Sequence, residues 1–313
     1  MKTRGVTLGV LSLAVGLFAV GSGSMSRAAA QVPAGYQGTI TLAVPGADNG
    51  PFSPSTVADF DLATGQLTAR FQGIDPTRAP DGEVAFIHRL QPGYTADHAV
   101  VVADPKGVLG PPLSICKDYN VDANQVCITP KLSPNTQLVA FGRRGPGQLC
   151  HNNFGTFFGD FVTVVDRHGN IVSSFEGFTY PEWFPNGQLL MLGTECRNAG
   201  IWITDAALRN VARVDDQITT PARAPAVSPD GSTVAFVWNG RVWTLGQAGL
   251  SDVTPPLQHP VFYAGWSPDG SALAALTASI NADKALVLFR PGDAGSVVTL
   301  RLPTYPSGPL SWR

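Results

Sequence analysis

A four-residue turn between two apolar runs recurs along this chain and constrains its fold more than any other feature. The clearest copy is Ser267-Pro268-Asp269-Gly270, which separates Ala264–Trp266 from Ala272–Leu276. Proline presets φ at the second position of such a turn, aspartate can hydrogen-bond its own backbone, and glycine accepts the positive φ that follows. The pattern therefore predicts a β-hairpin.

The turn occurs five times, and each copy is followed by an apolar run. The other copies are Ala79-Pro80-Asp81-Gly82, Ser133-Pro134-Asn135-Thr136, Phe184-Pro185-Asn186-Gly187 and Ser228-Pro229-Asp230-Gly231. Successive turn prolines are separated by 54, 51, 44 and 39 residues. These steps bracket the repeat length of about 40 to 50 residues that is typical of propeller blades.

The two ends of the chain complement each other. The first unit has three predicted strands and no turn hairpin before them, whereas the tail Gly308–Arg313 is one predicted strand with no hairpin after it. Trp312 occupies the place in this tail that Trp183 and Trp266 occupy two residues before a turn proline. The three strands of the first unit are Thr39–Val44, Val57–Asp61 and Gln66–Phe71.

We therefore expect an all-β, six-bladed β-propeller with four-stranded blades. In the second unit a separate strand, Thr77–Ala79, is expected to lead into the turn. The C-terminal strand is expected to complete the first blade, which would leave no open sheet edge between the two ends of the ring.

The segment Trp266–Gly270, with its sequence Trp-Ser-Pro-Asp-Gly, resembles the blade turns of the TolB-like and WD40-like (PD40) propellers. The resemblance covers residues 38–313 and is strongest from Trp183 onward. It implies a TolB-like propeller domain, and partners in the cell envelope. TolB proteins also carry an α/β domain before the propeller, for which we expect no room in this chain.

The first 30 residues have the pattern of a secretory signal peptide. Lys2 and Arg4 precede an apolar run from Val6 to Val20, and three alanines end at Ala30. This is the charged, apolar and small-residue order of a cleavable signal. An uncleaved anchor is the alternative, but the run is shorter than the roughly 20 residues of a spanning helix. We expect residues 31–37 to be a lead-in, no transmembrane span after cleavage, and a periplasmic or secreted protein.

Cleavage would leave 18 basic and 23 acidic side chains, because Lys2, Arg4 and Arg27 are lost with the leader. An acidic chain without a basic stripe does not favour nucleic acid as a partner.

Four cysteines in an exported chain predict disulfides. The predicted loop positions pair Cys116 with Cys127 and Cys150 with Cys196, one of three possible connectivities. Reduced, buried thiols are the alternative.

Long loops are expected on the face opposite the turns, and binding residues are often grafted onto such loops. The predicted loops are Pro45–Thr56, His88–Asp97, Gly142–Asp160, Gly193–Gly200 and Thr277–Lys284. The third of them holds arginine and aromatic residues, the types that anchor protein interfaces. These candidate partner-binding residues are Arg143, Arg144, His151, Phe154, Phe157 and Phe158. Alternatively, the phenylalanines cover the third blade and the arginines are solvated.

No catalytic or cofactor motif is present: Gly-x-Ser-x-Gly, Gly-x-Gly-x-x-Gly and the P-loop are all absent from the sequence. Several histidines and acids of the long-loop face could converge, but their spacing matches no metal-ligand motif, so no metal is expected. They are His88, Asp97, His98, His151 and Glu195.

The sequence favours an exported binding module that binds a protein or peptide through the long-loop face, without a cofactor and monomeric. The alternative is a small-molecule enzyme of lyase or lactonase type with a site at the central channel mouth, because propellers carry many functions.

Overall fold

The computed structural model describes residues 35–44, 55–90, 97–116, 126–151, 157–194, 199–277, 285–300, 302 and 306–313, without the side chains of 145–151, 157–159 and 307. Within these ranges the chain is all β, with strands β1 to β23 and no helix. Accordingly, the described residues contain no apolar helix long enough to cross a membrane.

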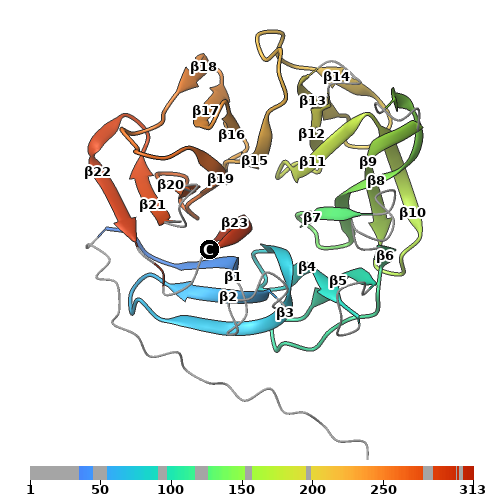
Figure 1. Cartoon of the computed structure of the whole chain (residues 1–313), viewed down its shortest axis with the longest axis horizontal. Coiled ribbons are helices and arrows are strands. Elements are labelled where there is room, and N and C mark those ends of the chain that lie inside the picture. The colour runs from blue at the N-terminus through green and yellow to red at the C-terminus, as the bar shows by residue number, and fades with distance from the viewer. Residues whose placement is uncertain are drawn as a thin grey trace, which may run out of the picture.

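Four of the sheets have four antiparallel strands each. Figure 1 shows them standing around a common axis, with β7, β11, β15 and β19 innermost. Their strands are β7 (Cys127–Leu132), β8 (Leu138–His151), β9 (Phe157–Asp166) and β10 (Ile171–Glu176); β11 (Phe178–Trp183), β12 (Leu189–Gly193), β13 (Gly200–Thr204) and β14 (Val211–Arg213); β15 (Arg223–Val227), β16 (Val234–Trp238), β17 (Arg241–Gly246) and β18 (Gly249–Asp252); β19 (Val261–Trp266), β20 (Leu273–Thr277), β21 (Ala285–Arg290) and β22 (Asp293–Leu300).

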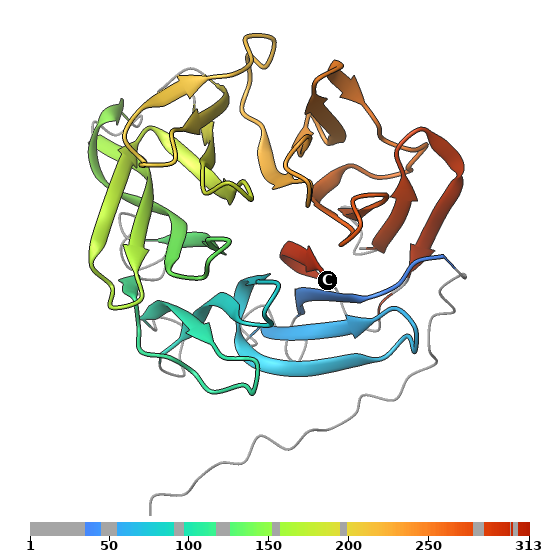
Figure 2. The same cartoon turned by 180° about the vertical axis from the view of Figure 1, so that it is seen from behind.

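The remaining sheet has seven strands in the order β23-β1-β2-β3-β4-β5-β6. The view from behind in Figure 2 shows it lining one side of the same ring. Its strands are β1 (Thr39–Val44), β2 (Thr56–Asp61), β3 (Leu67–Arg78), β4 (Val84–Arg89), β5 (His98–Ala103), β6 (Ser114–Cys116) and β23 (Ser307–Trp312).

Strand β3 is longer than predicted and joins two units. We expected separate strands at Gln66–Phe71 and Thr77–Ala79, but one continuous strand pairs first with β2 and then with β4. The crossing point is Gly73, where a Cβ atom would lie 2.5 Å from the Ile87 carbonyl oxygen. Because glycine has no Cβ, the strand can pass this close to β4 without a break.

The last strand lies beside the first one. Trp312 of β23 is opposite Ile40 of β1, and Ser311 is opposite Thr41. The Arg313 N–H donates to the Thr39 carbonyl at 2.8 Å, and the Thr39 N–H donates back to the Arg313 oxygen. Segments from the two ends of the chain therefore share one ladder.

Each innermost strand carries an irregularity in its ladder. Register shifts lie within Ile74–Thr77, Ile128–Lys131, Thr179–Glu182, Arg223–Ala226, Val261–Tyr263 and, for the β1–β23 pair, Thr41–Ala43. In four of these strands the residue five places before the turn proline has φ near +50°, namely Asp75, Thr129, Tyr180 and Ala224. Bulges of this kind bend a strand and change the direction of its side chains. Here they lie in the strands nearest the axis.

The predicted turns form with a repeated hydrogen-bond set. In the fourth copy the Ser228 hydroxyl donates to Asp230 Oδ1 at 2.6 Å and accepts the Thr233 N–H at 2.9 Å. The same Asp230 oxygen accepts the Ser232 N–H at 3.0 Å. These donors stabilise the carboxylate, led by the Ser228 hydroxyl, and lower the pKa of Asp230 to about 2.

Neighbouring sheets are joined through tryptophans of the innermost strands. The Trp183 indole donates to the Lys131 carbonyl of the preceding sheet at 3.0 Å, and the Trp266 indole donates to the Ala226 carbonyl at 3.0 Å. Trp312 instead donates to the Gln37 carbonyl at 2.8 Å. Each of the first two bonds satisfies a polar group at a sheet interface.

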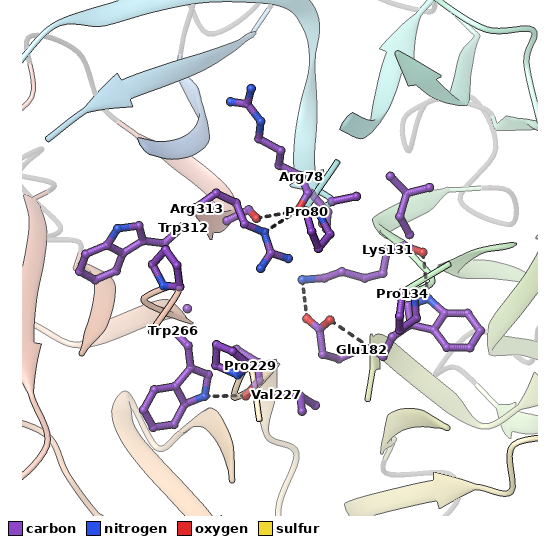
Figure 3. Close-up of a pocket in the computed structure, with 18 of the residues that line it drawn as sticks. Arg78, Pro80, Lys131, Pro134, Glu182, Val227, Pro229, Trp266, Trp312 and Arg313 are labelled. Atoms are coloured by element: carbon purple, nitrogen blue, oxygen red, sulfur yellow. Dashed lines mark hydrogen bonds and ion pairs between the residues drawn. The ribbon is translucent and has the colours of Figure 1, made fainter. Parts of the chain in front are cut away.

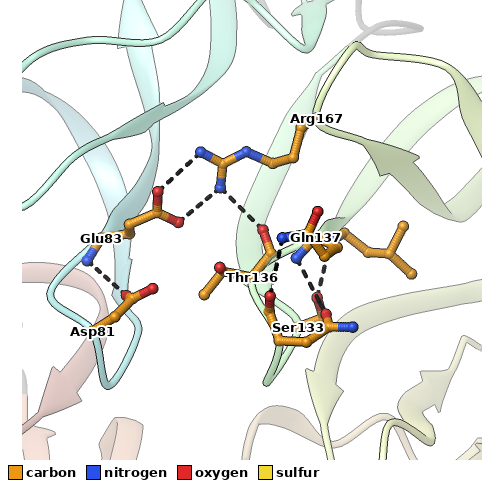
Figure 4. Close-up of polar contacts among 8 residues, drawn as sticks. Asp81, Glu83, Ser133, Thr136, Gln137 and Arg167 are labelled. Carbon is orange, nitrogen blue, oxygen red and sulfur yellow. Dashed lines mark hydrogen bonds and ion pairs between the residues drawn. The ribbon is translucent and has the colours of Figure 1, made fainter.

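Polar contacts also join the second and third units at their turns. The Arg167 guanidinium donates to both carboxylate oxygens of Glu83, at 2.8 and 3.1 Å, and to the Thr136 carbonyl at 3.1 Å (Figure 4). A bidentate arginine–carboxylate pair has a defined geometry, so this contact orients the two turns relative to each other.

A disulfide links Cys116, at the end of β6, to Cys127, at the start of β7, with 5.7 Å between the Cα atoms. It is one of the two bridges that the sequence predicts. The Cys150 side chain and all of Cys196 lie outside the described residues, so the second bridge stays a prediction.

We expect acid to weaken the fold partly through Asp230. The folded-state pKa of Asp230 is about 2, below its ordinary value of 3.8. Its contribution to stability is therefore fully present above about pH 4 and is lost as the pH falls towards 2. Asp230→Asn removes this contribution, so its melting temperature should fall less than that of the wild type between pH 4 and pH 2.

Ser228→Ala is the matched variant, because it leaves the carboxylate and removes its first donor. Its melting temperature should likewise fall less than that of the wild type between pH 4 and pH 2. An Asp230→Asn profile parallel to that of the wild type across this interval would contradict the assignment.

Candidate functional site

A cavity of about 510 Å³ lies at the centre of the ring, at the end where the repeated turns are. The ends of the innermost strands form its wall, and the turn prolines of all five copies lie around it (Figure 3). These prolines are Pro80, Pro134, Pro185, Pro229 and Pro268. The repeat that builds the fold therefore also builds the rim of this cavity.

One position in each repeat supplies much of the cavity wall. It is the residue three places before the turn proline, and in β23 the corresponding residue is the one before Trp312. The residues at this position are Thr77, Lys131, Glu182, Ala226, Gly265 and Ser311. Four of the six are small or short, which leaves room at the axis. At Gly265 a side chain would force Leu310 to move, because a Cβ there would lie 2.6 Å from Leu310 Cδ1.

The two charged residues at this position come from adjacent sheets and pair with each other. Lys131 Nζ lies 2.7 Å from Glu182 Oε2, and the two side chains are only 9% and 17% exposed. Figure 3 shows the pair reaching across the cavity wall between β7 and β11. Partly buried charges need such a partner, since removing either one from water costs several kcal/mol.

Arg313 adds a second cationic group to this wall. Its Nε donates to the Arg78 carbonyl at 3.1 Å, and its guanidinium points towards Lys131 and Glu182 (Figure 3). Burial lowers the pKa of the Arg313 guanidinium, while attraction to Glu182 raises it and repulsion by Arg78 lowers it further. Arg78 itself is paired with Asp59, at 2.8 Å, outside the cavity wall.

A further polar cluster lies around the bulges of the innermost strands. Asp75 Oδ2 accepts the Thr129 N–H at 3.0 Å. Burial raises the pKa of Asp75, against the effect of the Thr129 N–H and of Lys131. Burial, and then the charge of Asp75, raises the pKa of Tyr263. Gly308 leaves room for this carboxylate, because a Cβ there would lie 2.6 Å from Asp75 Oδ1.

The candidate partner-binding residues of the sequence lie elsewhere, on a long hairpin. Residues 142–160 were expected to be a loop, but β8 continues to His151 and β9 begins at Phe157. The loop prediction was wrong here because antiparallel pairing continues past Gly145, where a register shift absorbs the glycines and the proline that suggested a loop.

Arg144 Nε donates to Asp160 Oδ1 at 3.0 Å across this hairpin, and Arg143 lies opposite Phe161. The side chains of His151, Phe157 and Phe158, and all of Phe154, lie outside the described residues. Partner binding by these residues stays a prediction.

The histidines of the long-loop face have local partners where they are described. His88 Nδ1 lies 2.8 Å from the Gln72 carbonyl oxygen, and its ring meets Phe86 edge to face. Among the described residues, no three His, Cys, Asp or Glu side chains gather in a way that could hold a metal ion. The His151 side chain and Glu195 are not described.

Sequence reasoning missed Lys131, Glu182 and Arg313 as site residues. A signal was available for the first two, because two adjacent copies carry charges at a position where the next two copies have alanine and glycine. Nothing in the sequence indicated that the Arg313 side chain turns into the cavity.

No protein-family model and no curated protein sequence matches this chain. Its structure is similar to those of several propellers. TolB from Acinetobacter baumannii has 15% identity and a TM-score of 0.66, over 90% of this chain and 68% of that one. A nidogen/laminin complex has 11% identity and a TM-score of 0.59, over 88% and 98%. An oligogalacturonate lyase in complex with manganese has 14% identity and a TM-score of 0.51, over 84% and 74%.

At these identities the likeness shows the fold alone. The chain has a TolB-like β-propeller fold, and this fold is shared by proteins with different functions.

Removing one partner of the Lys131–Glu182 pair should destabilise the protein more than removing both. Lys131→Met leaves the Glu182 carboxylate without its partner, at a cost of about 3 kcal/mol. The double variant Lys131→Met, Glu182→Leu should recover most of this loss, because no unpaired charge remains. Urea unfolding of the wild type, both single variants and the double variant measures the coupling. Additive losses would show that the pair is not coupled.

Proposed function

We propose that this TolB-like propeller is an exported binding module, and that it holds a segment of a protein or peptide in the cavity at the turn end of its axis. The cavity itself carries the proposal. It has about 510 Å³, within the range of known ligand sites. It also combines an apolar rim of turn prolines with the charged groups of Lys131, Glu182 and Arg313.

Export is supported by two observations. The first 30 residues have the order of a signal peptide, and the structure holds the disulfide between Cys116 and Cys127. Disulfides persist in oxidising compartments such as the periplasm and the extracellular space. We therefore propose that the protein works in one of these two places.

Binding is favoured over catalysis by the chemistry of the cavity wall. Lys131 and Glu182 neutralise each other at 2.7 Å, so neither is poised as a free acid or base. The similar nidogen/laminin complex shows a protein complex that contains a propeller of related fold. The hairpin with Arg143 and Arg144 stays a second proposed contact surface on the far end of the strands.

We also propose that the sheets form six blades closed by the C-terminal strand. Strand β3 supports this, because it divides the seven-stranded sheet into two four-stranded units, β23-β1-β2-β3 and β3-β4-β5-β6. The ladder between Trp312 and Ile40 would then be the closing contact of the ring.

Deleting residues 308–313 should destabilise the whole ring. The deletion unpairs β1 and removes Leu310 and Trp312 from a core cluster that also contains Ile40 and Leu288. We expect the melting temperature to fall by at least about 10 °C, since burial of these two side chains is worth several kcal/mol. A chain that starts at residue 31 is the control. A truncated protein that melts with the parent would refute the closure.

Filling the cavity should abolish peptide binding. We expect random linear peptides, displayed on phage and panned against the wild type, to yield binders that compete for one site. Ser311→Trp places a large side chain in the cavity wall, so the selected peptides should bind it at least about tenfold more weakly by calorimetry.

Lys106→Ala, on an exposed outer turn, is the control and should bind like the wild type. The proposed function is wrong if no peptide is selected, or if selected peptides bind a folded Ser311→Trp protein as tightly as the wild type.

A further inference from the structure

We infer that the cavity recognises a carboxylate group on the bound segment, held by the Arg313 guanidinium beside Lys131. The carboxylate can belong to an aspartate or glutamate side chain or to a free peptide C-terminus. The inference rests on the proposed function and specifies the chemistry of the ligand.

The charges of the wall leave one group without a partner. Three ionisable side chains point into the cavity, namely Lys131, Glu182 and Arg313, whereas the Arg78 side chain points away from it (Figure 3). Arg78 is paired at 2.8 Å with Asp59, which also lies 3.4 Å from Arg70. Lys131 is paired with Glu182 at 2.7 Å. For Arg313 no ion pair is formed with any residue in the part of the chain that the structure describes.

The unpaired guanidinium is positioned for a ligand. Its Nε is engaged by the Arg78 carbonyl, which holds the side chain in place. No other described residue accepts a hydrogen bond from its two terminal nitrogens. The main-chain oxygen of Arg313 lies on the opposite side, against Thr39 and Gly38. The terminal nitrogens therefore face the cavity (Figure 3).

The geometry of the group selects a planar anion. Two parallel N–H groups of a guanidinium match the two oxygens of a carboxylate, and such charge-assisted pairs are about twice as strong as neutral hydrogen bonds. The neighbouring Lys131–Glu182 pair is neutral as a whole, so the net positive charge of the wall comes from Arg313. Glu182 in the same wall carries a negative charge, which disfavours a dianion such as phosphate more than a single carboxylate.

The surroundings indicate what flanks the carboxylate. The turn prolines around the rim form an apolar border. An extended segment with an acidic group between apolar residues matches this arrangement. A highly charged segment would lose hydration against these prolines without gaining polar partners.

Two selections test the inference. One library displays random peptides whose C-terminus is fused to the coat protein, so that only Asp and Glu supply carboxylates. The other displays peptides with a free C-terminus. We expect enriched acidic residues in the first library, or a dependence on the free terminus in the second, and the two formats distinguish the two sources.

Each selected peptide is then compared with its neutral form, Asp→Asn or the C-terminal amide, on the unaltered protein. Loss of one charge-assisted pair should weaken binding roughly 10- to 100-fold. Arg313→Met should weaken binding of the acidic peptide by a similar factor and should not weaken binding of the neutral peptide. Arg313→Lys keeps the positive charge but lacks the two parallel N–H donors of the guanidinium. Its affinity for the acidic peptide should lie between those of the wild type and Arg313→Met. Arg209→Met, on an exposed turn, is the matched control.

The outcomes separate the two proposals. Peptides that bind in the cavity without acidic enrichment, or neutral forms that bind the wild type as tightly as acidic ones, would overturn the carboxylate inference and leave the proposed function standing. Failure of both libraries would overturn the proposed function itself. The peptide comparison uses the wild type, so it decides the matter even if Arg313→Met does not fold.

Discussion

The fold depends on how each innermost strand is attached to its neighbour around the axis. Within a sheet, backbone ladders hold the strands, but no ladder crosses from β7 to β11 or from β15 to β19. There the contact is made by buried apolar side chains and by an indole N–H that bonds a carbonyl of the preceding innermost strand, as Trp183 does with Lys131. Because this bond satisfies two groups at an interface, losing it would cost more than its net gain.

The cavity forms because the innermost strands pack against one another around a central axis. The innermost strands approach each other closely enough for Trp266 to reach Ala226, yet small residues at the cavity position keep the centre open. The Lys131–Glu182 pair forms part of the cavity wall, and the turn prolines lie around it. A candidate site therefore arises from the repeat itself, at the end of the ring that carries the repeated turns.

A second cluster of polar residues lies at the bulges of the innermost strands. Asp75 bonds Thr129 of the next sheet and raises the pKa of Tyr263 by its charge, after the larger effect of burial. Asp75, Thr129 and Tyr180 all have positive φ. They occupy the same position of the repeat in successive innermost strands. This polar cluster therefore combines residues of different sheets, and no single repeat contains it.

Much of the architecture could be predicted from the sequence, because it depends on local rules. Proline, aspartate and glycine dictate the turns through φ and through side-chain-to-backbone bonds, as at Ser228–Gly231. The apolar runs after the turns dictate the strands, and their spacing indicates the propeller. The cysteine positions are equally local, and the Cys116–Cys127 bridge agrees with the pairing predicted from them.

Only the tertiary structure decided the site. Lys131, Glu182 and Arg313 are far apart in sequence, and they meet because strands that follow different turns end at one axis. The continuous strand β3 and the extended hairpin of β8 and β9 also escaped prediction, since pairing partners determine where a strand stops. Backbone preferences act over a few residues, whereas a cavity is a property of the space between elements, and that space exists only once the ring has formed.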